Sequence, residues 1–206
     1  MDLLRAPAFC AGVLVQLVFA AGLQGFSLIL ALWLQSGQHY SPIRAGVTTV
    51  AFSAGAFVTA CLSVSLAARL GRRILVAGAL MMAAGMYGVL LAAHHCATGV
   101  DPWQLVPGLV VAGAGLGFLV VPLVNVVLAA VPGELAGGAS GVFSTAQQVG
   151  GAVGVAVAGS VFFPRVATAG FTAAFELAMP LTIGAFAGCA LLSLALPRTA
   201  VPDAYE

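Results

Sequence analysis

The sequence contains no lysine and very little charge of either sign. Only 6% of its 206 residues are charged, all seven basic residues are arginines, and the net charge is +1. A charge this small gives no support to nucleic-acid binding, so we expect no nucleic acid among the partners. By contrast, 62% of the residues are hydrophobic and the mean hydropathy is +1.13. This composition leaves too little polar surface to coat a soluble globule.

Cysteine and histidine are too few and too scattered to form a recognisable metal site. The four cysteines lie far apart without the paired spacing of metal ligands, and we interpret them as small hydrophobic residues. His94, His95 and Cys96 are adjacent, but three consecutive side chains cannot all face one ion, and a fourth ligand is not evident. We therefore predict a solvated loop at these residues, with no metal and no other cofactor.

The apolar residues fall into six long runs. About 20 mostly apolar residues are needed for a helix to cross the ~30 Å of hydrocarbon in a bilayer. Runs of that length follow one another along the chain, separated by short segments that contain glycine, proline or charge. The sequence predicts an all-α integral membrane protein, with a single six-helix transmembrane domain over residues 1–206. The expected spans are 8–34, 44–68, 74–93, 103–131, 140–163 and 174–196.

The positions of the arginines predict the orientation, because cytoplasmic loops carry an excess of basic residues. If both termini are cytoplasmic, five arginines lie inside and two lie outside. We therefore expect this orientation, which also places Trp33, Tyr40 and Trp103 near the outer interface. The inner arginines are then Arg5, Arg69, Arg72, Arg73 and Arg198, and the outer ones are Arg44 and Arg165.

Few polar side chains lie at membrane depth, and each is a candidate site because such residues normally face protein or water. At 100° per residue, the three on the first span lie within roughly 80° of one another and form one polar stripe. Two interpretations remain open, namely hydrogen bonds that hold helices together and the lining of a substrate cavity. The candidates are Gln16, Gln24 and Ser27 on the first span, Asn125 on the fourth, and Gln147 and Gln148 on the fifth.

Aspartate, glutamate, arginine and histidine are absent from the middle of every expected span. Proton-driven pumps usually need an ionisable relay at that depth. This chain alone therefore lacks an evident means of coupling transport to protons.

Small residues recur at four-residue spacing on three expected spans. Close approach of backbones through such residues favours helix association in lipid, so we expect them to form helix–helix contacts. Proline also occurs within the fourth and sixth spans, where it removes a backbone hydrogen bond and can kink the helix. The small residues are Gly113 and Gly117, Gly150, Gly154 and Ala158, and Gly184 and Gly188, and the prolines are Pro107, Pro122 and Pro180.

Residues 138–141, GASG, resemble the GxSG motif of the rhomboid intramembrane proteases, which also have six helices. A nucleophilic serine needs a base within hydrogen-bond reach. All three histidines precede Ser140 and are expected on the outer side, whereas Ser140 is expected at the inner end of its helix, a membrane thickness of ~30 Å away. We therefore do not expect an intramembrane serine protease, or any other enzyme.

Three longer segments resemble the major facilitator superfamily. They are LQSGQHYSPIRAG after the first span, GAGLGFLVVP in the fourth, and GGASGVFSTAQQVGGAVGVAVAGSVF through the fifth. Nearly the whole chain resembles the C-terminal half of a fourteen-helix drug:proton antiporter of the EmrB/QacA type. The resemblance implies transport of a small hydrophobic substrate, and it places the first, fourth and fifth spans beside a central cavity. The polar candidates lie on these same spans.

The loop between the second and third spans resembles the cytoplasmic motif G-x-L-x-D-R-x-G-R-R of that superfamily. Val64 stands in place of the leading glycine and Ala68 in place of the acid. This loop therefore lacks the acidic partner that a charge-paired conformational latch would need. The matching positions are Leu66, Arg69, Gly71, Arg72 and Arg73.

The resemblance also implies a missing partner, because a complete exporter of this type has an N-terminal portion that carries its proton-coupling acids. We therefore expect a truncated or partial protein, one half of a split transporter, or a homodimer that imitates the full fold. The two halves of such folds are related by an axis along the membrane normal, which makes pairing with a second copy feasible. The partner would be an N-terminal half of six to eight helices or a second copy of the chain.

A different class of function remains as the alternative, namely a non-transporting membrane interaction protein that binds a partner through its glycine-rich faces. In both cases the chain would lie in a lipid bilayer. Arginine without lysine, together with abundant alanine, glycine and valine, is typical of a GC-rich bacterial genome. We therefore expect a multi-pass protein of the bacterial inner (plasma) membrane.

Overall fold

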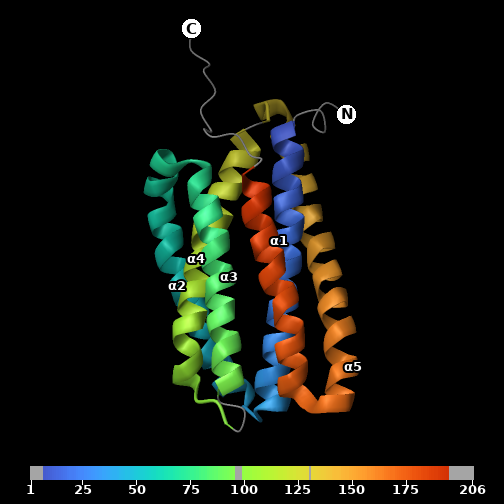
Figure 1. The fold of residues 1–206 in the computed structure, drawn as a ribbon. Coiled ribbons are helices and arrows are strands. Elements are labelled where there is room, and N and C mark those ends of the chain that lie inside the picture. Colours follow the sequence, from blue (N-terminus) through green and yellow to red (C-terminus); the bar gives the residue numbers. More distant parts are fainter. Residues whose placement is uncertain (1–6, 96–98, 130, 195–206) are drawn as a thin grey trace.

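The computed structural model is almost entirely helical over the residues that it describes, which are 7–95, 99–129 and 131–194. Five helices in this part of the chain are long and apolar enough to cross a membrane. A helix satisfies its own backbone hydrogen bonds, which is what long apolar segments require in lipid. The elements shown in Figure 1 are α1 (Pro7–Leu32), the π-helical turn η2 (Trp33–Gly37), α2 (Pro42–Leu70), α3 (Arg72–His95), α4 (Pro102–Ala129), the 3-10 turn η3 (Gly133–Leu135) and α5 (Ala136–Ser193).

Helix α5 is broken at Gly170 into two arms. Gly170 has φ 84° and ψ 175°, a backbone conformation that is essentially restricted to glycine. Figure 1 shows the chain running down the first arm (orange) and back along the second (red), so the two arms are antiparallel. This single residue therefore reverses the direction of a 58-residue helical segment.

The first arm is longer than the sequence predicts. The expected fifth span ends at residue 163, before Pro164, and a loop should follow it. Instead, Pro164 lies inside the helix, which continues to the break at Gly170. The continuation is favoured by packing, because Phe162 is fully buried and Val166 packs against the main core.

Helix α4 lies between α2 and α3, and it meets both through backbone contacts. A Cβ atom at Gly113 would overlap the carbonyl oxygen of Phe52 on α2. A Cβ atom at Gly117 would likewise overlap Thr59 and the carbonyl oxygen of Ala56 on the same helix. Glycine at these positions lets the helices approach closely, which favours association in lipid.

Helix α1 lies against both arms of α5, and its contact with the first arm also depends on small residues. A Cβ atom at Gly150 would overlap the carbonyl oxygen of Leu17, and one at Gly154 would overlap that of Ala21. Ala158, one turn further along, is 2% exposed and approaches Gly25. The expected stripe on the fifth span therefore lies in a close helix–helix contact.

Gly184 and Gly188 on the second arm form no such contact. A Cβ atom at either position would meet nothing within 4 Å among the residues that the structure describes. These two glycines share the four-residue spacing of the others but lie on a face of α5 that no other described helix approaches closely. The close helix–helix contact expected at these two glycines is therefore not found among the described residues.

Buried apolar side chains form two clusters, one toward each end of the bundle. One cluster contains Phe9 near the start of α1 and Ile74 near the start of α3, and the partly buried Leu192 near the end of α5 packs against it. The larger cluster includes Trp33 and Phe175. We refer to these as the Phe9 end and the Trp33 end of the bundle.

Two of the three aromatic residues expected at the outer interface are packed inside the protein. Trp33 is fully buried and stacks on Phe175, with ring centroids 4.4 Å apart. Its indole nitrogen donates a hydrogen bond to the hydroxyl of Thr172 (3.3 Å). Tyr40 is 5% exposed, whereas Trp103 is 81% exposed. Trp33 and Tyr40 therefore join helices and loops instead of meeting lipid.

Candidate functional site

Three of the predicted glutamines line one groove between α1 and the first arm of α5. Gln24 contributes from α1, and Gln147 and Gln148 contribute from α5. The groove has a volume of about 590 Å³, and all three glutamines are exposed. We call it the glutamine groove, and its other lining residues are Ser144, Gly151, Ala152 and Val155.

Helical spacing explains why these residues come together. Positions separated by three, four, seven, eight or eleven residues share one face of a helix, and the lining residues of α5 follow that spacing from Ser144 to Val155. A Cβ atom at Gly151 would lie 3.0 Å from Cγ of Gln24. The missing side chain at Gly151 therefore makes room for Gln24 against α5.

The side chains that line the groove can form hydrogen bonds but carry no charge. Each primary amide supplies two N–H donors and one acceptor oxygen, and the Ser144 hydroxyl adds one of each kind. None of the described lining residues is ionisable. The arrangement suits a neutral molecule with polar groups, and it has no group that could act as a general acid or base.

The other predicted cavity residues lie elsewhere. Gln16 is 4% exposed, and the carbonyl of its neighbour Val15 accepts a hydrogen bond from the Cys189 thiol of α5 (3.7 Å). Ser27 donates to the carbonyl of Leu23 (2.8 Å) in its own helix and lines a separate cavity beside α2. Asn125 is exposed on α4, outside the glutamine groove. The expected polar stripe on α1 is therefore divided among three environments.

Ser144 is the groove residue that the sequence interpretation missed. It lies three and four residues before Gln147 and Gln148, so helical spacing already places it on their face. Ser140, the residue of the protease-like motif, donates its hydroxyl hydrogen to the carbonyl of Gly137 (2.9 Å) in its own helix.

The loop motif between α2 and α3 lies at the Phe9 end. Gly71 has φ 51° and forms the turn between the two helices. Arg72 donates from Nη1 to the carbonyl of Leu194 (2.6 Å), which ties the start of α3 to the end of α5. Arg73 is exposed, and Leu66 packs against the Phe9-end core. The side chain of Arg69 lies outside the described part of the structure.

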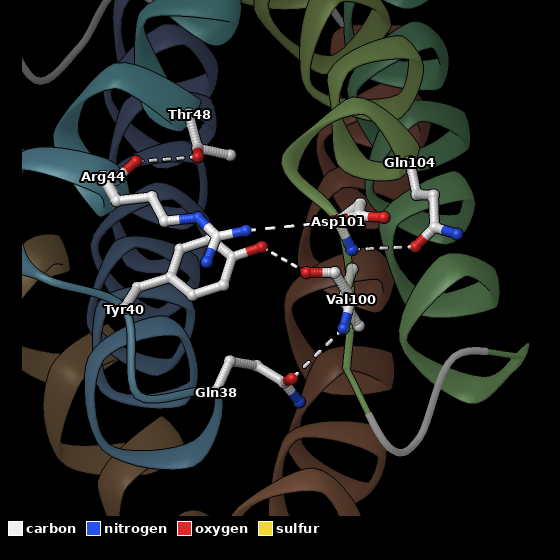
Figure 2. Close-up of polar contacts among 7 residues, drawn as sticks. All are labelled: Gln38, Tyr40, Arg44, Thr48, Val100, Asp101 and Gln104. Carbon is white, nitrogen blue, oxygen red and sulfur yellow. Dashed lines mark hydrogen bonds and ion pairs between the residues drawn. The ribbon is translucent and has the colours of Figure 1, made fainter.

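A polar cluster at the Trp33 end joins the loop before α2 to the loop before α4 (Figure 2). The hydroxyl of Tyr40 donates to the carbonyl of Val100, and the amide nitrogen of Val100 donates to Oε1 of Gln38 (3.3 Å). The guanidinium of Arg44 lies 4.1 Å from the centroid of the Tyr40 ring and 3.8 Å from the Asp101 carboxylate. We call these five residues the Tyr40 clasp.

Burial is the main influence on the pKa of Tyr40. Desolvation raises the pKa of Tyr40, the positive charge of Arg44 lowers it, and Asp101 raises it, with a net increase from the ordinary value of 10.0. The Arg44 and Asp101 side chains are 50% and 76% exposed, so their ion pair stabilises the fold by less than about 1 kcal/mol. The buried Tyr40 hydrogen bond is therefore the main attachment between the two loops.

A second contact at the same end joins α3 to the second arm of α5. Nδ1 of His94 lies 3.0 Å from the Glu176 carboxylate. The two side chains are 69% and 32% exposed. His94 and His95 are the last residues of α3, so the loop predicted at these residues is wrong for both of them, although both side chains are exposed. Cys96 lies outside the described residues.

Comparison with known proteins identifies the family. Residues 12–205 match the family model of the Major Facilitator Superfamily. The chain belongs to this superfamily. The five long apolar helices among its described residues and its bacterial relatives in the superfamily make it a multi-pass protein of a bacterial plasma membrane.

Several superfamily members of known name are similar in sequence. A probable actinorhodin transporter of Streptomyces coelicolor is 43% identical over 164 residues, which are 79% of this chain and 28% of that protein. A puromycin resistance protein of Streptomyces alboniger is 34% identical, over 68% of this chain and 28% of its own length. A tetracenomycin C resistance and export protein of Streptomyces glaucescens is 30% identical, over 81% and 30% respectively. The chain thus spans less than a third of the length of these relatives.

Proposed function

We propose that the chain acts as the C-terminal half of a drug exporter of the fourteen-helix EmrB/QacA type, and that it moves small hydrophobic molecules out of the cell. The observation that carries this proposal is the glutamine groove. Exposed amides on a helix face are costly against hydrocarbon, so this face is suited to a water-filled cavity or a partner. An uncharged groove with hydrogen-bonding groups then forms one wall of a substrate cavity.

The proposal includes six crossings with both termini in the cytoplasm. The two arms of α5 would each cross the membrane once, which requires the reversal at Gly170. Support for an even number comes from the Phe9-end core, where the start of α1 packs with the end of α5. In the proposed orientation, Arg72 and Arg73 at this end are cytoplasmic, whereas Arg44 at the Trp33 end is outside.

Coupling to protons would reside in an N-terminal portion of the transporter. The described residues that line the glutamine groove include no ionisable group, so the groove itself offers no proton relay. The relatives named as exporters or resistance proteins of antibiotics support export as the activity. The proposed partner is an N-terminal half of six to eight helices, or a second copy of this chain.

Efflux from cells tests the proposal. The chain is expressed alone, and together with the N-terminal half of an actinorhodin-transporter-like relative, and accumulation of the uncharged dye Nile red is followed by fluorescence. We expect lower accumulation only when both halves are present. Efflux by the chain alone would instead support a homodimer.

Substitutions in the groove make the test specific. Gln147→Ala combined with Gln148→Ala is expected to reduce efflux while membrane insertion is unchanged. Ser160→Ala is the matched control, because Ser160 is exposed on the same arm, donates to the carbonyl of Val157 (2.8 Å) and lies outside the groove. If no combination of halves changes dye accumulation, the non-transporting interaction protein becomes the better interpretation.

A further inference from the structure

A second cavity lies toward the Trp33 end, between α1 and α2. It has a volume of about 380 Å³, within the range of ~300–1,000 Å³ that is typical of ligand pockets. Helix α2 packs against α4 and α1 packs against α5, which leaves space between α1 and α2. The described lining residues of this cavity all differ from those of the glutamine groove. We call it the α1–α2 cavity.

Its walls are apolar and partly aromatic. Phe26 of α1 and Phe52 of α2 face each other across the helices, with ring centroids 6.3 Å apart and planes inclined by 40°. Leu30 and Leu109 are buried and complete the walls. An aromatic ring of a bound molecule could contact these two tilted rings edge-on or with an offset, which are the arrangements that aromatic pairs prefer. The walls therefore suit a flat aromatic molecule.

The fixed hydroxyl groups of the cavity are hydrogen-bond acceptors. The Ser27 hydroxyl donates its only proton to the carbonyl of Leu23 (2.8 Å), and the Thr49 hydroxyl donates its own to the carbonyl of Gly46 (2.8 Å). Each oxygen retains lone pairs after that donation. A bound molecule would therefore meet acceptors at these two positions and would be held best if it carried an N–H or O–H donor.

Charge is absent from the lining. The remaining polar side chains among the described lining residues are Gln35 and Ser53, and none is ionisable. An ion would lose its hydration in such a site without gaining a partner, which is costly. The cavity therefore favours a neutral molecule over a charged one.

We propose that the α1–α2 cavity binds a small, uncharged aromatic molecule that carries a hydrogen-bond donor, such as a phenol. The claim that this molecule is a transported substrate rests on the proposed function. The claim that the cavity binds it does not, because binding to the purified chain requires neither transport nor a second half.

Gly46 provides a way to fill the cavity without disturbing the fold. It lines the cavity, and a Cβ atom there would meet nothing within 4 Å among the described residues. Gly46→Leu therefore places a side chain in the cavity while the helix backbone is unchanged. Gly184→Leu is the matched control, since a Cβ at Gly184 is equally unobstructed within the described chain and this residue lies outside the cavity.

Binding of 2-naphthol to the full chain in lipid nanodiscs tests the site. Equilibrium dialysis gives the saturable part of binding after subtraction of empty nanodiscs. We expect saturable binding to the wild type and to Gly184→Leu, and its loss in Gly46→Leu. Equal binding to Gly46→Leu and the wild type, or wild-type uptake no greater than that of empty nanodiscs, would overturn the proposal.

The donor requirement is tested with 2-methoxynaphthalene, which has the same rings but no O–H. We expect it to bind the wild type about fivefold more weakly, the effect of one net hydrogen bond. The double variant Ser27→Ala, Thr49→Val should bind both probes alike. Equal affinity of the wild type for both probes would refute the donor requirement. If the chain binds 2-naphthol but no combination of halves exports the dye, the result contradicts only the proposed transport function and leaves the binding site in place.

Discussion

The phenol of Tyr40 donates a hydrogen bond to the backbone carbonyl of Val100, 60 positions further along the chain. Both residues are buried, with exposed fractions of 5% and 3%. Each belongs to a connector, one before α2 and the other before α4, so the bond holds together the ends of helices that are distant in sequence (Figure 2). A buried Val100 carbonyl without its donor would destabilise the folded protein. The hydrogen bond therefore contributes more to stability than the exposed ion pair beside it.

Tyr40→Phe is expected to reduce the free energy of unfolding by about 1–3 kcal/mol, because the buried Val100 carbonyl loses its donor while the ring remains. Denaturant unfolding in detergent, followed by the fluorescence of the buried Trp33, measures the loss. Tyr87→Phe is the control, since Tyr87 is 53% exposed. An equal change in the two variants would show that the Val100 hydrogen bond does not stabilise the fold.

Stability should also fall at alkaline pH because of Tyr40. Burial raises the pKa of this phenol above 10.0 in the folded protein, so the unfolded chain ionises first as pH rises. The contribution to stability is therefore fully present below pH 10.0 and is lost as pH rises toward the folded-state pKa. The difference in unfolding free energy between wild type and Tyr40→Phe, followed from about pH 9 to about pH 11, should shrink. A constant difference would contradict the argument.

Gly113→Ala should weaken the contact between α4 and α2. The added Cβ would overlap the Phe52 carbonyl oxygen, and overpacking of this kind typically costs about 1–3 kcal/mol. Gly184→Ala should be neutral or stabilising by about 0.5–1 kcal/mol, because alanine favours helix and the position is open. Thermal unfolding of the two variants side by side gives the comparison, and a less stable Gly184→Ala would contradict it.

Gly170→Ala should destabilise the reversal of α5. At φ 84° and ψ 175° a side chain introduces strain of about 1–3 kcal/mol. Gly141→Ala provides a control in a helical part of the first arm, where a Cβ meets nothing within 4 Å among the described residues. Protease resistance and unfolding in detergent report the difference. If both variants match the wild type, the break does not depend on the conformation of Gly170.

Periodicity and hydropathy in the sequence predict only part of the fold. Four-residue spacing identified Gly150 and Gly154, which do lie in a close contact with α1. The same spacing at Gly184 and Gly188 leads to no close contact in the described chain. Spacing determines which residues share a helix face, but what that face meets depends on the arrangement of the other helices.

The residues of the candidate site were also predictable only in part. Residue type and depth were enough to select Gln24, Gln147 and Gln148, which line one groove. Gln16 was selected by the same reasoning but is buried, because angular position on one helix does not reveal which side its neighbours cover. The Tyr40 clasp had no sequence signal, since its partners come from two separate connectors.

The paired glycines between α3 and α4 determine how this contact can change by mutation. A Cβ at Gly115 would lie 2.5 Å from the carbonyl oxygen of Gly78, and a Cβ at Gly78 would lie 2.8 Å from that of Gly115. Either substitution alone separates the helices, so the second adds little to the first and the two effects are not additive. The chain can therefore lose this contact in one mutational step, but once both positions have changed it needs two steps to restore it.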